Sequence, residues 1–159
     1  MRLSAESHAR VEQFFREHTG DDRLVLPPIH FHGGLGARLL MRAVGTGAIT
    51  FGRHVFVSPR LLVRDAEGRV TLPGWLAAHE AAHVLQYEAR GFARFLRDYL
   101  RGYWRALRGG RRWDARGRTE AYLAIPEECE AREAEHAYSS RAQTADLKRG
   151  GAGARLQDL

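Results

Sequence analysis

The stretch Thr71–Gly91, TLPGWLAAHEAAHVLQYEARG, decides how the rest of this chain is organised. Pro73 is typical of the first position of a helix, and Gly91 is typical of the left-handed residue that follows a helix end. The residues between them are mostly apolar or small, and a helix that is apolar nearly all round belongs in a protein interior. We therefore predict one buried helix here.

His79, Glu80 and His83 are the only strongly polar side chains between Gly74 and Leu85. Ionisable groups in an interior are costly unless they are paired or bind a metal. The two histidines are four residues apart, so both imidazoles leave one helical face and can ligate Zn²⁺. Glu80, on the neighbouring face, can act as a general base on water. The alternative is a pair of core histidines satisfied by nearby carboxylates.

Length and composition limit the remaining possibilities. We predict a single domain over residues 1–142 of the 159-residue chain and a polar, glycine-rich, flexible tail over residues 143–159. No apolar run predicts a transmembrane segment, and the N-terminus lacks the apolar part of a Sec signal peptide. One cysteine, Cys129, excludes an intrachain disulfide. We expect a cytoplasmic chain, or one exported by a dedicated secretion machine.

Three further segments carry clear periodicity. Ser4–His18 is typical of a short amphipathic helix, and Ala48–Pro59 of a strand or a tight hairpin. Phe92–Arg108 places aromatic and apolar residues at helical spacing over four turns, which predicts an amphipathic helix that covers the core. Together with the motif helix, these segments predict a mainly helical α+β fold with a small sheet or hairpin before the motif.

The segment Leu24–Leu40 is more ambiguous. LVLPPIHFH is expected to be extended, because two adjacent prolines break a helix, and a turn is expected at the three following glycines, Gly33, Gly34 and Gly36. His30 and His32 would lie on one face of a strand and could form a secondary metal site. Solvent-facing or core-satisfied histidines are the alternative.

Positive charge is concentrated in one segment. Between Arg90 and Arg118 there are ten arginines and two acidic residues, a local net charge of +8, whereas the whole chain carries +6. Such a patch could hold an acidic substrate or partner, nucleic acid or an anionic membrane. The alternative is a solvated helix face. The candidate contact residues are Arg101, Arg105, Arg108, Arg111 and Arg112.

A catalytic zinc site needs a third protein ligand, and Thr119–Ser140 is its natural source. Pro126 is expected to begin a helix with Glu127, Glu128 and Glu130 in its first turns. Carboxylates there also suit the helix dipole as plain solvated residues. The residues themselves do not choose among the three.

Three sequences carry a family resemblance. HEAAHVLQ at His79–Gln86 resembles the core of small bacterial HExxH zinc metallopeptidase domains, which are often found with toxins and contractile injection systems. Gly47–Gly52, GAITFG, resembles the strand that precedes the motif in that family. Glu128–Arg132 resembles the stretch from which gluzincin-type peptidases supply a glutamate ligand, although Arg132 stands where they commonly have aspartate. Tyr87 replaces the family's second glutamine.

This resemblance implies a zincin-like mini-fold and a peptidase that acts on a peptide or protein substrate. It implies one Zn²⁺ per chain on His79, His83 and Glu128, with Glu80 as the general base. Tyr122, Tyr138 and His136 are candidates for stabilising the transition state.

Two other functions remain open. One is a non-catalytic zinc module that binds nucleic acid or an acidic partner through its arginines, and the other is a helical protein with an accidental motif. A DNA-associated protease of the SprT-like group is disfavoured, because that group usually has a third histidine ligand and no histidine here lies in an obvious matching motif.

Overall fold

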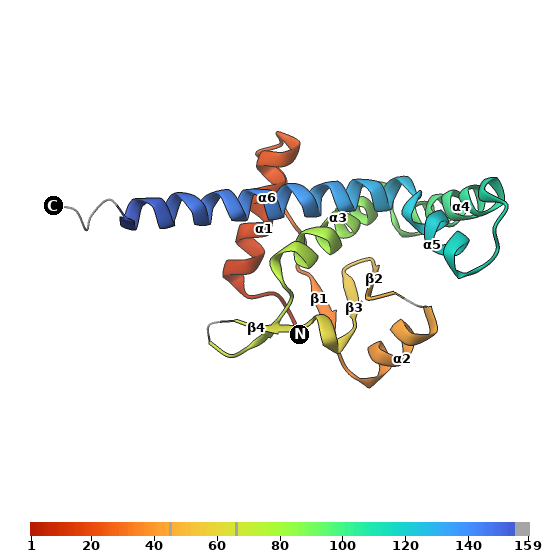
Figure 1. Cartoon of the computed structure of the whole chain (residues 1–159), viewed down its shortest axis with the longest axis horizontal. Coiled ribbons are helices and arrows are strands. Elements are labelled where there is room, and N and C mark those ends of the chain that lie inside the picture. Colours follow the sequence, from red (N-terminus) through yellow and green to blue (C-terminus); the bar gives the residue numbers. More distant parts are fainter. Residues whose placement is uncertain (45, 66, 155–159) are drawn as a thin grey trace.

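The molecule is built around the motif helix. The computed structural model describes residues 1–44, 46–65 and 67–154. Helix α3 (Gly74–Arg90) lies between the long helix α6 (Pro126–Ala154) and a small three-stranded sheet, and α1 (Ala5–Thr19) crosses beside it (Figure 1). The predicted class, a mainly helical α+β fold with a small sheet before the motif helix, is confirmed.

The ends of α3 follow from its flanking residues. Pro73 has φ −61° and ψ 146°, so its backbone is extended and it precedes the helix, whereas the sequence placed it at the first helical position. The Pro73 carbonyl accepts the N–H of Ala77 at 2.9 Å. Gly91 has φ 75°, a value that favours glycine, and its N–H donates to the Tyr87 carbonyl at 2.8 Å.

Alanines bring α3 and α6 close together. Ala78 and Ala81 on α3 and Ala131 on α6 are fully buried, and Ala134 is nearly so. Small side chains at a helix crossing shorten the distance between the axes. A glutamate side chain on α6 can therefore reach the histidines of α3.

The sheet has the order β1-β3-β2, with β1 (His30–His32) parallel to β3 (His54–Val57) and β2 (Ala48–Phe51) antiparallel to it. Strands β2 and β3 form the predicted hairpin, and Gly52 at its turn has φ 59°. Phe31 and Val55 are fully buried on the inner face and belong to the same core as α3. The histidines of the strands lie on the opposite face.

The remaining upstream elements are α2 (Leu35–Val44), a 3₁₀ turn (Pro59–Leu61) and a hairpin of β4 (Val63–Arg64) and β5 (Val70–Thr71). Helix α1 forms as predicted, with the Ser4 hydroxyl accepting the Ser7 N–H at its start. The predicted turn over the three glycines ends before Gly36, because Gly36 already belongs to helix α2. Ala37 and Met41, four residues apart on α2, are buried, and this packing favours the helix.

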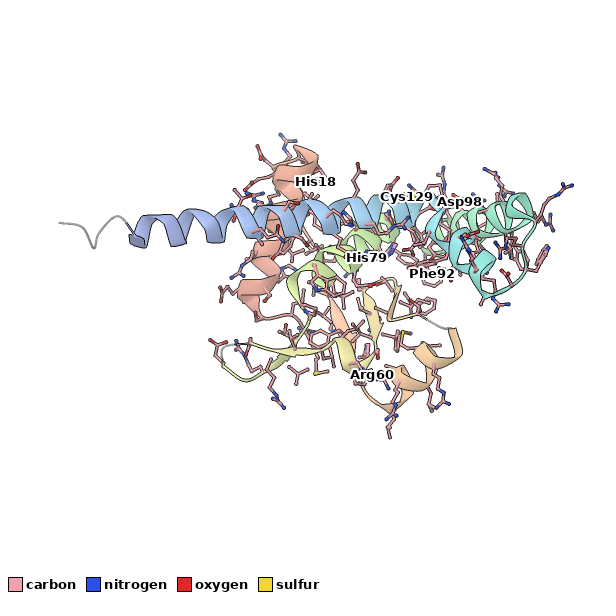
Figure 2. The ribbon with its side chains drawn as sticks, viewed as in Figure 1. His18, Arg60, His79, Phe92, Asp98 and Cys129 are labelled. Carbon is pink, nitrogen blue, oxygen red and sulfur yellow. The ribbon has the colours of Figure 1, made fainter. Side chains whose placement is uncertain are left out.

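Downstream of α3 lie α4 (Phe92–Gly110) and α5 (Ala115–Leu123), at the end of the molecule where Phe92 and Asp98 are labelled (Figure 2). The predicted helix is present, but it covers the core with one edge only. Phe95 and Leu107 are buried, whereas Leu100 and Trp104 are about half exposed. Helix α4 packs along one side against α5 and α3, which leaves its other apolar edge uncovered by the described residues.

Within the described residues, no helix combines the length and apolar character that crossing a membrane requires. Helix α6 continues to Ala154, well into the segment expected to be a flexible tail, and residues 155–159 lie outside the described part. The division at residue 142 remains a prediction.

Candidate metal centre

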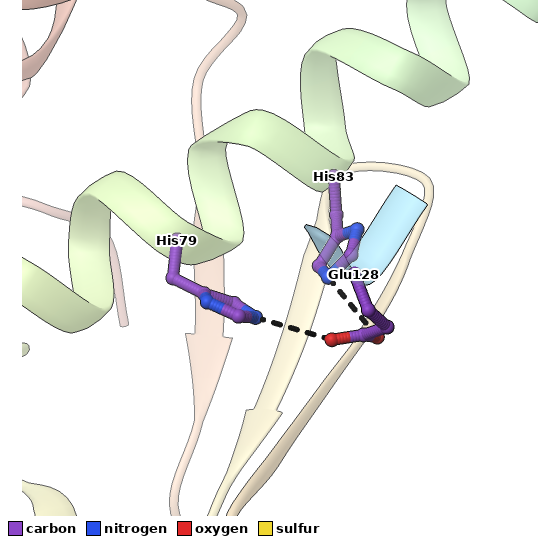
Figure 3. A group of neighbouring side chains, drawn as sticks. All are labelled: His79, His83 and Glu128. Carbon is purple, nitrogen blue, oxygen red and sulfur yellow. Dashed lines mark ion pairs between the residues drawn. The ribbon is translucent and has the colours of Figure 1, made fainter. Parts of the chain in front are cut away.

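Three side chains from two helices converge between α3 and α6. His79 and His83 lie one turn apart on α3, and Glu128 lies in the first turn of α6. The Nε2 atom of His79 is 3.6 Å from Glu128 Oε2, and Nε2 of His83 is 3.4 Å from Glu128 Oε1 (Figure 3). The three residues offer ligand atoms that all lie within 4.8 Å of one another.

The other nitrogen of each imidazole is held by a hydrogen bond. His79 Nδ1 lies 3.0 Å from Glu135 Oε2, and His83 Nδ1 lies 2.9 Å from Gln86 Oε1. A carboxylate and an amide oxygen only accept, so both Nδ1 atoms donate. In the neutral imidazoles the lone pairs of the two Nε2 atoms therefore face Glu128, and this is the tautomer that a metal ligand requires.

The electrostatics of this group are those of a site that holds a cation. Burial lowers the pKa of His79 and of His83, but their close contacts with the Glu128 carboxylate and the negative charge of Glu80 outweigh this effect, so both pKa values are raised. Burial raises the pKa of Glu128, but its contacts with the two histidines hold that pKa well below its usual range. The side chains of His79, His83 and Glu128 are only 12%, 7% and 3% exposed.

The residues fit a divalent metal ion. Donor atoms bound tetrahedrally to Zn²⁺ lie about 3.3–3.6 Å apart, which matches the two nitrogen–oxygen distances given above. Glu128 Oε2 is buried and accepts no hydrogen bond from the described residues, whereas Tyr99 donates to Oε1 at 2.7 Å. A cation shared by the three side chains would satisfy this buried carboxylate oxygen and the two imidazole lone pairs beside it.

The other two candidate glutamates have different partners. Glu127 accepts from Arg90 at 2.5 Å. Glu130 accepts from the Gln86 amide at 2.8 Å, and that contact fixes which way the amide of Gln86 faces. The geometry thus brings Glu128, rather than its two neighbours, to the histidines.

Glu80 lies on the adjoining face of α3 and is 3% exposed. Its Oε2 accepts a hydrogen bond of 2.5 Å from the hydroxyl of Thr50 on β2. Because β2 is held by β3 through a full antiparallel register, the carboxylate is anchored to the sheet. The strand that the sequence singled out therefore positions Glu80.

The candidates for stabilising a transition state lie in different places. Tyr122 of α5 lies near the cluster: burial and then Glu128 raise its pKa. Tyr138 is not brought there, because its ring packs edge-on against Phe14 of α1, 5.2 Å between centroids. His136 is exposed on α6.

Sequence reasoning missed four supporting residues. Thr50 and Gln86 lie inside the quoted motifs, but their partners depend on packing; Tyr99 occupies an apolar position of its helix and gave no signal. Glu135 supplies the carboxylate that accepts from His79 Nδ1. It lies one turn after Arg132, the position at which gluzincin-type peptidases commonly have aspartate. Arg132 instead donates to the Glu128 carbonyl at 3.2 Å.

The remaining candidate residues lie apart from this centre. Three arginines of α4 and two of the following loop are exposed, and one of these, Arg112, pairs with Asp114 at 3.0 Å. On the outer sheet face, His32 Nε2 lies 3.1 Å from His54 Nδ1, and the His30 ring stacks on His54. Among the described residues, only the group on α3 and α6 brings three ligand atoms together.

Comparison with known proteins identifies one family. The eCIS core domain, named for the extracellular contractile injection system, matches residues 3–91, more than half of the chain. The match includes the sheet and all of α3, and it ends before Glu128. Searches of curated proteins and of solved structures gave no significant match. The chain therefore belongs to the eCIS core domain family, and its possible metal group combines two histidines from the matched region with a glutamate from outside it.

Proposed function

We propose that this protein is a metal-dependent peptidase that operates with a contractile injection system. The observation that supports the proposal most strongly is the convergence of His79 Nε2, His83 Nε2 and the Glu128 carboxylate, with Glu80 fixed on the next face of the same helix. Two nitrogens and one oxygen form the ligand set of many catalytic zinc sites. One zinc ion per chain is the expected occupancy.

Each residue would have a distinct task. His79, His83 and Glu128 would hold the ion, which would supply Lewis acidity toward a peptide carbonyl and toward water. Glu80 would take a proton from water at its carboxylate and pass it to the departing amine. Thr50 would hold that carboxylate in place beside the ligand set, and Tyr122 would donate a hydrogen bond to the developing oxyanion.

Family membership supports the biological setting of this proposal. A domain of an injection system can be exported by that system, and we propose this route for the chain. Its substrate would then be a peptide or protein.

The deciding experiment measures metal content and peptide hydrolysis for the wild type, Glu80→Gln and Glu88→Gln. Glu88 lies on the same helix but is exposed and paired with Arg53 at 2.9 Å, so its variant is the matched control. We expect Glu80→Gln to keep its metal and lose about 10²–10⁴-fold in turnover. Full activity in that variant would refute the role of Glu80.

A second candidate function rests on the burial of the cluster. With side chains 3–12% exposed, the centre is also suited to a closed, structural metal site that joins α3 to α6. The chain would then be a non-catalytic module that engages an acidic partner or nucleic acid through its arginines. Stoichiometric metal without hydrolysis of any peptide in a broad library would favour this function.

A further inference from the structure

The uncovered edge of α4 combines apolar and cationic side chains. Leu100 and Trp104 are four residues apart, so they lie on one side of the helix, and the Trp113 ring lies 6.3 Å from that of Trp104. These three side chains, here called the α4 ridge, are 47%, 49% and 58% exposed. Large apolar side chains that are grouped and left open to solvent mark an interaction surface.

A line of arginines runs beside this ridge. Arg101, Arg105 and Arg108 are exposed and follow one another at spacings of four and three. Among the ion pairs of the described residues, none includes these three, whereas Arg94 and Arg97 both reach Asp98. The guanidinium groups beside the ridge therefore have no carboxylate to neutralise them within the described structure.

We propose that the α4 ridge and its arginines bind the surface of a membrane rich in anionic lipids. Leucine and tryptophan beside a row of arginines are typical of helices that lie in the headgroup region without crossing the bilayer. Indole rings are favoured at that depth, and anionic headgroups would neutralise the arginines. The ridge would enter the boundary of the acyl chains, and α4 would lie parallel to the surface.

Nucleic acid fits the same patch less well. Bases stack on aromatic rings and phosphates pair with arginine, so a nucleic acid would use the indoles and the guanidinium groups. It would leave Leu100, nearly half exposed, without an apolar partner. A lipid surface covers Leu100 and the indoles alike. This inference does not depend on the metal centre.

The test is co-sedimentation of the whole chain with vesicles of equal parts phosphatidylglycerol and phosphatidylcholine, beside pure phosphatidylcholine vesicles. We expect binding to the anionic vesicles only. Leu100→Ser/Trp104→Ser should lower the partition coefficient at least tenfold. Arg101→Gln/Arg108→Gln should lower it about fivefold for each charge, about twenty-five-fold for the pair. The matched control is Arg23→Gln/Val25→Ser, an exposed arginine and an exposed valine after α1, which should bind like the wild type.

Three results would overturn the proposal. One is the absence of binding to the anionic vesicles. Another is a Leu100→Ser/Trp104→Ser variant that binds like the wild type while circular dichroism shows it folded, since binding would then be electrostatic adsorption alone. The third is displacement of the protein from vesicles by a short single-stranded DNA at equimolar phosphate, which would assign the patch to nucleic acid.

Discussion

The molecule holds two groups of histidines, and they differ in almost everything except residue type. On α3, two imidazoles turn their Nε2 atoms to one carboxylate, and hydrogen bonds to Glu135 and Gln86 fix their orientation. On the outer sheet face, His30, His32 and His54 contact mainly one another. The shifts of pKa are also opposite: raised for the α3 pair, lowered for His30 and His32.

The difference lies in what surrounds the imidazoles. An acceptor that binds Nδ1 of a histidine fixes its tautomer, and a carboxylate near Nε2 offers a further ligand atom. The donor atoms for a metal are then already arranged. The sheet histidines lack any carboxylate within the contacts that the described residues show. A hydrogen bond between His32 Nε2 and His54 Nδ1 satisfies one nitrogen of each ring. Spacing along the chain suggested both groups as metal sites, and only the partners separate them.

The largest expected effect is on metal content. His83→Ala removes a proposed metal ligand that is nearly fully buried, so we expect the metal content to fall from the proposed one ion per chain to none. His54→Ala should leave it at one. Mass spectrometry of purified protein measures both. A loss of metal in His54→Ala would show that the sheet histidines form the ion's site.

Two buried threonines test whether the hydrogen-bond partner of a polar side chain, rather than its burial alone, decides its contribution to the free energy of unfolding. Thr50 and Thr71 are both buried, at 6% and 8% exposed, but Thr50 donates to Glu80, and the Thr71 hydroxyl has no partner among the described residues. Thr50→Val should lower the free energy of unfolding by about 1.5–3 kcal/mol. Thr71→Val, which removes an unsatisfied hydroxyl, should be neutral or stabilising. Urea unfolding measures both, and equal effects would contradict this explanation.

Removing the support behind a ligand should weaken the metal site without abolishing it. In Gln86→Ala the His83 ring loses the acceptor for its Nδ1, so we expect metal affinity to fall about 10–100-fold. Gln13→Ala removes an exposed glutamine of α1 and is the control. Competition with a chromogenic chelator gives the affinities. An unchanged affinity in Gln86→Ala would mean that the backbone alone orients His83.

Local features of the sequence predicted the motif helix, its two histidines and the hairpin before it, because each depends on residues within a few positions. Glu128 could not be chosen over Glu127 and Glu130 in this way. The choice depends on the close crossing of α3 and α6 at their alanines and on Arg90 and Gln86, which engage the other two.

The arrangement of α4 shows a second limit of sequence reasoning. Helical periodicity predicted the helix, but it did not distinguish the apolar edge that packs on the core from the apolar edge that is exposed to solvent. Tyr99 counted as one more apolar position, and its hydroxyl contacts Glu128. Burial of a residue on a long amphipathic helix depends on where neighbouring helices end, which no short pattern records.

The smallest expected effect is a difference in pH dependence, and it isolates the sheet histidines. Burial, and then neighbouring positive charge, lowers the pKa of His30 and His32 from 6.5. The unfolded chain therefore binds protons more readily than the folded one, and stability present above about pH 6.5 is lost as the pH falls below it. His30→Gln/His32→Gln should lose less stability than the wild type between about pH 7.5 and about pH 5.5. Urea midpoints at both pH values measure this loss of stability.

Both proteins keep His79 and His83, so the metal centre contributes equally to each and cancels in the comparison. Identical pH dependence in the two proteins would show that the sheet histidines titrate alike in the folded and unfolded chain.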